Sequence, residues 1–186
     1  MRIISGLFKG KKILQPKDRE TRPLKDLTKE SIFNILKHSN LFEINIEKSN
    51  ILDLFSGVGS FGIECLSRGA EKVTFCENYQ RVLPILKENI SNLDLEKKSN
   101  IISKDIFDLN KQDFINKKFE VIFLDPPYRE DRLKELLEKF INFKILKKKG
   151  IFIIHRHKKE KDQFPSNFKI LKEKKYGFSK IIFGKF

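Results

Sequence analysis

The run Asp125-Pro126-Pro127-Tyr128 combines residue types that could hold a planar amino group. Two successive prolines fix φ and remove two backbone donors, so they leave a rigid turn edged with carbonyl acceptors. The carboxylate of Asp125 adds an acceptor, and the ring of Tyr128 adds a flat face. An exocyclic amine could donate to Asp125 and to the Pro126 carbonyl while its base stacks on Tyr128. We predict that these four residues are catalytic; the alternative is a purely structural turn.

A glycine-rich segment that begins at Asp53 indicates a cofactor site, because its glycines would let the backbone turn tightly and approach a ligand. Glu77 ends the next apolar run, where an acid can bind ribose hydroxyls. The pattern fits a dinucleotide, an adenosyl group or a tight turn alone. Asp53 favours the adenosyl group, since a carboxylate would repel a pyrophosphate and attract a cationic amino group. The cofactor-binding residues predicted here are Asp53, Phe55, Gly57, Gly59, Gly62 and Glu77.

Asp105 and Ile106 follow the third apolar run of the chain. Ligands of open parallel sheets bind at the carboxyl ends of the strands. Asp105 could accept a hydrogen bond from an adenine amine, and Ile106 could pack on the ring. We predict both as cofactor-binding residues, although an aspartate here could equally cap a helix or a turn.

Apolar runs alternate with segments of helical periodicity from about Asn50 onward. Strands are predicted at Ile51–Leu54, Lys72–Cys76, Asn100–Ser103, Glu120–Leu124 and Gly150–Ile154. Helices are predicted at Ser60–Arg68, Tyr79–Leu93, Asn110–Asn116 and Arg129–Phe143. Short apolar strands separated by helices indicate a parallel sheet covered on both faces, and right-handed crossovers make it a doubly wound α/β fold.

The two ends of the chain depart from this alternation. Phe168–Tyr176 and Phe178–Phe183 are strand-like, so we predict a hairpin that closes the sheet with an antiparallel strand. At the other end, Arg2–Lys25 is basic and Asp26–Leu36 has the apolar periodicity of a helix. We therefore divide the chain into an N-terminal arm with a lead-in helix, residues 1–45, and a main domain, residues 46–186.

The net charge is +14, from 39 lysines and arginines against 25 acidic residues. Such an excess favours a polyanionic partner, because cations near phosphates gain affinity by releasing counterions. A lysine-rich proteome would also explain it, and charge alone does not separate RNA, DNA and acidic membrane. In the arm we predict phosphate contacts, with a solvated flexible tail as the alternative. The residues are Arg2, Lys9, Lys11, Lys12 and Arg22.

Cys65 and Cys76 are the only cysteines, and their spacing fits neither a disulfide framework nor a zinc site. Their apolar surroundings predict buried thiols. The first residues do not resemble a signal peptide, and no apolar run approaches the roughly 18 residues that a membrane span needs. We expect a cytoplasmic protein with no membrane partner and no metal, and nothing in the sequence indicates more than a monomer.

The segments Asp53–Gly62 and Asp125–Tyr128, with Glu77 and Asp105, resemble amino-methyltransferases with a Rossmann-like fold. The arm narrows the resemblance through Arg2-Ile3-Ile4-Ser5-Gly6, Lys9-Gly10-Lys11, Thr21-Arg22-Pro23 and Lys29-Glu30-Ser31-Ile32-Phe33-Asn34. The ending Tyr176-Gly177-Phe178-Ser179-Lys180-Ile181 also matches a final hairpin. Together these motifs are similar to the bacterial 16S ribosomal RNA guanine-N2 methyltransferase family of the RsmD type.

This resemblance implies a mostly parallel, seven-stranded Rossmann-like sheet with a C-terminal antiparallel hairpin. It also implies methyl transfer from S-adenosylmethionine to the N2 amine of a guanine in 16S rRNA, within a small-subunit assembly particle. Two sites depart from the family pattern. Leu24-Lys25 stands where small hydroxyl residues are expected, and His155-Arg156-His157 stands where an acid is expected, which leaves local substrate contacts open.

Other functions share parts of this pattern. DNA adenine-N6 or cytosine-N4 methyltransferases also carry Asp-Pro-Pro-Tyr, but they usually need extra sequence for target recognition. Glutamine methyltransferases acting on protein usually begin the motif with Asn. A catalytically silent RNA-binding module could keep the fold, although the intact Asp125–Tyr128 run argues against decay. An NAD-dependent oxidoreductase would be recognised by which cofactor shifts the melting temperature.

Overall fold

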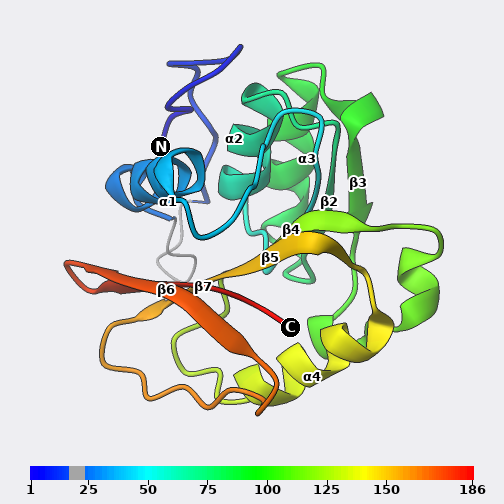
Figure 1. The fold of residues 1–186 in the computed structure, drawn as a ribbon. Helices are drawn as coiled ribbons and strands as arrows, with labels where there is room; N and C mark the ends of the chain where they lie inside the picture. Colours follow the sequence, from blue (N-terminus) through cyan, green and yellow to red (C-terminus); the bar gives the residue numbers. More distant parts are fainter. Residues whose placement is uncertain (17–23) are drawn as a thin grey trace.

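The computed structural model describes residues 1–16 and 24–186, which fold around one twisted sheet (Figure 1). The strands are β1 (Asn50–Leu54), β2 (Lys72–Cys76), β3 (Ser99–Ile102), β4 (Phe119–Leu124), β5 (Leu146–His157), β6 (Lys169–Tyr176) and β7 (Ser179–Lys185). Within the described residues the sheet has seven strands in the order β3-β2-β1-β4-β5-β7-β6. β7 runs antiparallel to both of its neighbours, β5 and β6, and the other neighbouring pairs of described strands are parallel. The predicted Rossmann-like sheet with a C-terminal antiparallel hairpin is therefore confirmed.

Each central strand sends alternate side chains into two hydrophobic cores, one on each face of the sheet. In β1, Ile51 enters the first core and Leu52 the second, and in β4 Phe123 and Leu124 divide in the same way. Because both faces are covered, these strands are apolar at nearly every position. This double burial explains why an uninterrupted apolar run could be predicted as a strand.

The helices supply the outer layers of both cores. They are α1 (Asp26–His38), α2 (Ser60–Ser67), α3 (Leu83–Ser91) and α4 (Leu133–Phe143). Apolar residues of α1, α2 and α3 belong to the first core, and those of α4 belong to the second. Figure 1 shows the same division, with α1, α2 and α3 on one side of the sheet and α4 on the other. The two cysteines, Cys65 in α2 and Cys76 in β2, are buried free thiols, as predicted.

Some predicted boundaries were wrong for local reasons. The helix expected at Asn110–Asn116 is a short 3-10 helix, η3 (Lys111–Phe114), closed by a capping box between Asn110 and Asp113. Two further 3-10 helices are η1 (Glu96–Lys98) and η2 (Ile106–Asp108). The helix predicted from Tyr79 begins only at Leu83, and Pro84 lies in its first turn, as the missing N–H of proline favours. The helix predicted from Arg129 likewise begins at Leu133.

The N-terminal segment is packed onto the sheet domain over residues 1–16. Arg2 and Lys12 form an antiparallel bridge, and the apolar side chains of Ile3 and Ile13 are buried in the first core. A flexible tail is therefore excluded for this stretch. α1 shares the same core, so the arm and its helix pack with the main domain, and the division at residue 45 stays a prediction.

Backbone groups of the arm are bound by side chains of α2 and α3. The amides of Ile4 and Ser5 donate to the buried carboxylate of Glu64 at 2.8 and 3.0 Å. The amide of Leu14 donates to Asn89 Oδ1 at 2.7 Å. Gly6 has φ +84°, and a Cβ there would lie 1.9 Å from the Ser67 carbonyl oxygen, so this turn requires glycine. None of the described helices is long and apolar enough to cross a membrane.

Candidate active site

A cavity of about 1010 Å³ opens at the carboxyl ends of the parallel strands. Residues at or just beyond the ends of β1, β2, β4 and β5 line it, together with the turn before β7. Most of the predicted site residues meet there: Asp53, Phe55, Gly57, Glu77, Asp105, Ile106, Asp125, Pro126, Pro127 and Tyr128. The topology therefore brings the predicted cofactor and catalytic residues to one cavity, as expected for ligands of open α/β sheets.

Asp53 and Glu77 are held by backbone amides of the glycine-rich turn. Gly62 N donates to Asp53 Oδ2 at 2.9 Å, and Gly57 N donates to Glu77 Oε2 at 2.8 Å. The other oxygen, Asp53 Oδ1, is buried and has no hydrogen-bond partner among the described residues. Burial is the main cause that raises the pKa of Asp53 well above its usual value, and the charges of Asp125 and Glu77 add to it. A buried, unpartnered acceptor of this kind suits a cationic ligand group.

Gly59 and Gly62 are not among the residues that line the cavity, and their assignment to the cofactor site stays a prediction. Gly59 has φ +85° and precedes α2. Gly62 lies inside α2, where a Cβ would come within 2.3 Å of the Phe75 ring. Its role is close packing of α2 on β2 and donation to Asp53. Phe55, with φ +58°, does line the cavity.

Asp105 caps a 3-10 helix, which was the alternative to its prediction as a cofactor-binding residue. Its Oδ1 accepts from Phe107 N at 2.8 Å as the N-cap of η2, and its Oδ2 accepts from Asn78 Nδ2 at 2.9 Å. Because Asp105 also lines the cavity, capping does not remove it from contact with a ligand. Ile106 is 3% exposed and belongs to the second core while facing the same cavity.

Asp125 is paired with a histidine that the sequence did not identify as a partner. His155 Nδ1 lies 2.7 Å from Asp125 Oδ1, and His155 Nε2 lies 2.9 Å from Ser179 Oγ. A carboxylate only accepts, so Nδ1 carries a proton, and in the neutral ring Nε2 accepts from the Ser179 hydroxyl. This arrangement fixes the orientation of the Asp125 carboxylate at the cavity wall.

Arg156 holds the proline turn through hydrogen bonds to its backbone carbonyls. Its guanidinium donates to the Pro127 carbonyl at 3.1 Å and to the Glu130 carbonyl at 2.7 Å. The third contact is Arg156 Nε to Asp162 Oδ1 at 2.7 Å, and Lys180 Nζ lies 2.8 Å from the other oxygen of Asp162. All three charged side chains are buried, so the network is shielded from water. It holds in place the carbonyls that follow Pro126.

The pairing of the strands explains why His155 and Ser179 lie next to Asp125. Leu124 is paired with Ile154, so the next residues, Asp125 and His155, emerge side by side. His157 is paired with Ser179 across β5 and β7, which brings the start of β7 to the same edge. The departure from the family pattern at His155-Arg156-His157 is thus part of the site. In the other departure, Leu24 is buried and Lys25 exposed, and both line the cavity.

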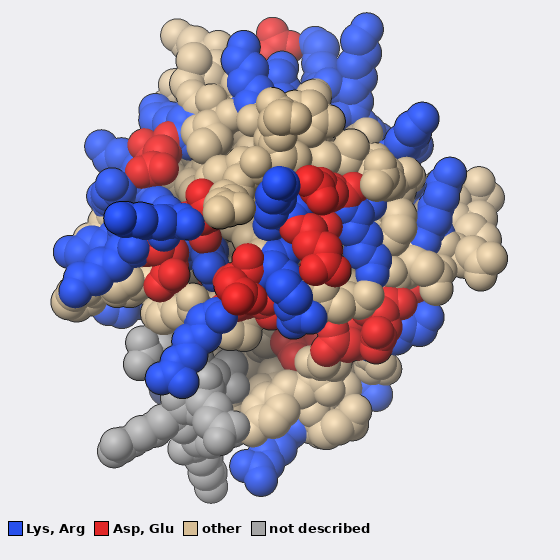
Figure 2. Space-filling model, turned by 90° about the horizontal axis from the view of Figure 1, so that it is seen from below, with Lys and Arg blue, Asp and Glu red and all other residues tan. Residues whose placement is uncertain are grey.

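Four of the residues predicted to bind RNA lie together on the N-terminal segment. Arg2, Lys9, Lys11 and Lys12 are exposed, whereas Arg22 lies outside the described residues. The turn that carries Lys9 packs against the C-terminal end of α2, where Phe8 N donates to Ser67 Oγ at 3.0 Å. The cavity lies at the opposite end of α2, near Ser60. Figure 2 shows one face of the molecule, on which acidic side chains gather near the middle among lysines and arginines.

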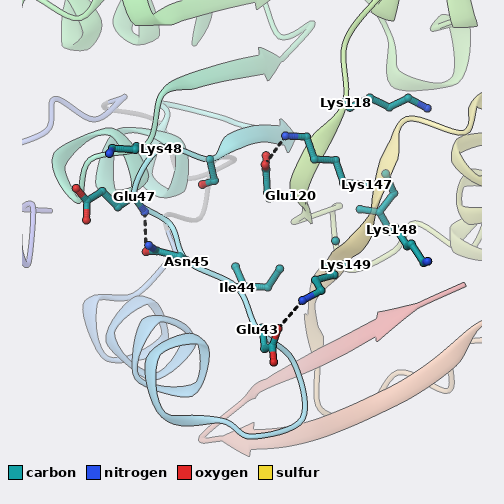
Figure 3. Close-up of a pocket in the computed structure, with 13 residues that line it drawn as sticks. Glu43, Ile44, Asn45, Glu47, Lys48, Lys118, Glu120, Lys147, Lys148 and Lys149 are labelled. Carbon is teal, nitrogen blue, oxygen red and sulfur yellow. Dashed lines mark hydrogen bonds and ion pairs between the residues drawn. The ribbon is translucent and has the colours of Figure 1, made fainter.

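A second cavity, of about 710 Å³, lies at the opposite edge of the sheet, where β1, β4 and β5 begin (Figure 3). Two of its lysines have acidic partners in its own wall: Lys147 pairs with Glu120 at 2.5 Å and Lys149 with Glu43 at 2.7 Å. The amino ends of parallel strands are not where such folds bind ligands. We therefore place the candidate active site at the first cavity. No group of His, Cys, Asp or Glu suited to a metal ion occurs among residues 1–16 and 24–186.

The strand order and the two turns, glycine-rich after β1 and Asp-Pro-Pro-Tyr after β4, define a Rossmann-like protein of the methyltransferase class. The family model described as Conserved hypothetical protein 95 matches residues 1–185. The chain belongs to this family, that of the ribosomal RNA small subunit methyltransferases D.

The relatives of the chain agree with this placement over nearly its whole length. The Haemophilus influenzae ribosomal RNA small subunit methyltransferase D is 34% identical over 178 residues, 95% of this chain and 89% of the relative. The Buchnera aphidicola protein of the same name (from Acyrthosiphon pisum) is 33% identical, over 92% of this chain and 86% of the relative. The solved structure of a proposed methyltransferase from Escherichia coli shares the fold, with a TM-score of 0.81 and 24% identity over 99% of this chain and 96% of that one.

Proposed function

We propose that this chain transfers a methyl group from S-adenosylmethionine to the exocyclic N2 amine of a guanine in 16S ribosomal RNA. The substrate would be a small-subunit assembly particle in the cytoplasm, and the chain would act as a monomer. The main observation in support is that the Asp125–Tyr128 turn lines the same cavity as Asp53 and Glu77. Arg156 holds this turn through a hydrogen bond to the Pro127 carbonyl. Family membership supports rRNA as the substrate.

The residues at the cavity suit S-adenosylmethionine. Its cationic amino group would satisfy Asp53 Oδ1, the buried acceptor that has no partner among the described residues. Glu77 stands at the end of β2, where an acid can bind ribose hydroxyls, and Asp105 with Ile106 would bind the adenine. When bound, the cofactor supplies a methyl group on a sulfonium, which loses its charge on transfer and needs no metal.

The chain's own residues would orient the amine. The lone pair of an exocyclic amine is delocalised into its ring, which makes the nitrogen a poor nucleophile. Asp125, oriented by His155, and the Pro126 carbonyl would accept its two hydrogens and direct the lone pair away from the ring plane. Tyr128 would stack on a base that has left its helix. Arg2, Lys9, Lys11, Lys12 and Arg22 would contact phosphates around it.

Cofactor affinity is expected to depend on pH through Asp53. Burial raises its pKa in the free protein, so its protonated form persists to a higher pH than that of an ordinary aspartate, whereas an ammonium ligand favours the carboxylate. Binding should therefore release a proton, and affinity should fall as pH falls through this raised pKa. Calorimetric titration with S-adenosylmethionine below about pH 7, where the ligand's amino group stays protonated, measures this.

The Asp53→Asn variant is the control for this pH dependence. It keeps the shape of the side chain but not its charge, so we expect binding weaker by about tenfold, with a flatter pH profile. An affinity that varies with pH as steeply in Asp53→Asn as in the wild type would assign the proton to another group.

Removing the Asp125 carboxylate is expected to abolish turnover without loss of cofactor binding. Asp125→Ala should lower kcat by at least about 100-fold, because an acceptor that positions the amine is lost. The affinity for S-adenosylmethionine should stay within about threefold, since Asp125 faces the acceptor amine and not the cofactor. Asp131→Ala, an exposed acid a few residues later, serves as the control and should behave like the wild type. Cofactor binding lost together with turnover would contradict the role proposed for Asp125.

The function itself is tested by tritium transfer from labelled S-adenosylmethionine into small ribosomal subunits from a strain that lacks this gene. We expect the label in 16S rRNA, recovered as N2-methylguanosine after nucleoside analysis. Label in DNA or protein instead would keep the chemistry and overturn the substrate. Cofactor binding without transfer to any acceptor would favour a silent RNA-binding module.

A further inference from the structure

An exposed aromatic side chain stands at the rim of the active-site cavity. Phe178 lies in the turn between β6 and β7, is 65% exposed and lines the cavity. Single exposed apolar residues are ordinary on protein surfaces. Among the described residues, however, the other large apolar side chains that are exposed lie away from this cavity. Phe178 is therefore placed where a bound substrate would cover it.

Phe178 extends a series of rings that begins at the proline turn. Its ring and that of His157 are nearly parallel, with centroids 6.1 Å apart and an angle of 10° between planes. Tyr128 meets His157 edge-on, with centroids 5.3 Å apart. We call His157 and Phe178 the aromatic ledge. It continues the flat surface from the catalytic turn to the outer rim of the cavity.

The ledge is held in place by a backbone hydrogen bond, and a positive charge lies beside it. Lys158 N donates to the Phe178 carbonyl at 2.8 Å, which ties the β6–β7 turn to the end of β5. The Lys158 ammonium lies 5.0 Å from the centroid of the Phe178 ring. Gly177, with φ +54°, allows the tight turn that presents Phe178. A rigid aromatic surface beside an exposed cation is the arrangement that binds single-stranded nucleic acid.

We propose that the aromatic ledge stacks on an unpaired base that neighbours the methylated guanine, with Lys158 beside the adjoining phosphate. This inference rests on the proposed function. A target base that leaves its helix also leaves its neighbours without a stacking partner. A side-chain platform at the rim would replace that lost stacking and keep the opened strand at the cavity. The ledge thus acts on substrate affinity and not on the methyl transfer itself.

Steady-state kinetics with small subunits from the gene-deletion strain test the ledge. Phe178→Leu keeps apolar volume without the ring, and we expect it to raise KM for the subunits about tenfold with kcat within about twofold. Phe178→Tyr keeps the ring and should behave like the wild type. Affinity for S-adenosylmethionine should be unchanged in both variants. The matched control is Ile115→Ala, an apolar side chain of similar exposure, 63%, away from the cavity.

A further measurement separates stacking from damage to the fold. Once the target is mapped, two RNA fragments are compared, one intact and one with an abasic site beside the target. The wild type should bind the abasic fragment more weakly than the intact one. Phe178→Leu should bind the two fragments equally. An equal loss of affinity for the abasic fragment in both proteins would contradict the stacking role of the ledge. An unchanged KM for Phe178→Leu, or a loss confined to kcat, would also overturn it. A KM that rises for subunits while affinity for protein-free 16S rRNA stays constant would assign Phe178 to a ribosomal protein.

The outcomes also distinguish this inference from the function on which it rests. No methyl transfer to rRNA by the wild type would overturn both. Transfer by the wild type, with Phe178→Leu equal to it in KM, would overturn the ledge alone.

Discussion

Replacing Arg156 with methionine is expected to lower kcat by about 100-fold and the free energy of unfolding by about 3 kcal/mol. The guanidinium bonds the Pro127 and Glu130 carbonyls and pairs with buried Asp162. Its loss releases the Asp125–Tyr128 turn proposed to be catalytic and leaves Lys180 as the charged partner of the buried Asp162 carboxylate. The effect on kcat follows from position. The Pro126 carbonyl can accept a hydrogen bond from the amine only when the turn that carries it is held in place. Urea unfolding and single-turnover methylation measure the two effects.

Arg156→Lys separates charge from geometry. A lysine keeps a positive charge beside Asp162 but cannot bond two carbonyls and a carboxylate at once, because it has a single ammonium. We expect it to recover most of the stability and little of the turnover, with affinity for S-adenosylmethionine unchanged. If a stable Arg156→Lys protein turned over at the wild-type rate, Arg156 would have only a structural role.

Replacing Glu64 with alanine should produce the largest loss of stability, about 3–5 kcal/mol. Its carboxylate is fully buried and accepts from Ile4 N, Ser5 N and Arg68 Nε at 2.8 to 3.0 Å, with Lys29 Nζ 3.7 Å away. Lys29 is itself buried, and burial lowers its pKa against the opposing effect of Glu64. Without Glu64, a buried ammonium loses its main counter-charge and two arm amides lose their acceptor.

Hydrogen exchange and a double variant check this explanation. The amides of Ile4 and Ser5 should lose protection in Glu64→Ala, while amides of β1 and β4 keep theirs unless the whole fold opens. Adding Lys29→Met should restore part of the lost stability, because it removes the stranded charge. Glu71→Ala, an exposed acid beyond α2, is the control and should change stability little. If Glu64→Ala were as stable as Glu71→Ala, the arm would not depend on this carboxylate.

The parts of the fold that could be predicted are those whose signal is local. β1, β2 and β4 are mostly apolar because both faces are buried, and the glycine-rich and proline turns are recognisable from their residue types. The packing of the arm could not be predicted, because its amides bond side chains that are 59 to 75 residues away in the chain. The short η3 was misjudged because Asn110 and Asp113 close a capping box where a longer helix was expected.

The candidate site shows the same limit. Asp53, Glu77 and Asp125 were found from motifs, but the partners of Asp125 required the order of the strands. His155 reaches Asp125 only because β5 lies beside β4, and Ser179 reaches His155 only because β7 is inserted between β5 and β6. Gly62 was assigned to the cofactor site from its spacing, and only the structure shows that it also packs α2 against Phe75.

The anchoring of the N-terminal arm also sets an order of events during synthesis. Ile4 and Ser5 leave the ribosome before their acceptor, Glu64, which is made 60 and 59 positions later. Asn89, which binds Leu14, follows 75 positions after it. The arm therefore cannot dock until α2 and α3 have been made. A peptide fused ahead of Met1 would begin close to Ser60, which lines the candidate active-site cavity and whose hydroxyl contacts the Met1 sulfur at 2.8 Å.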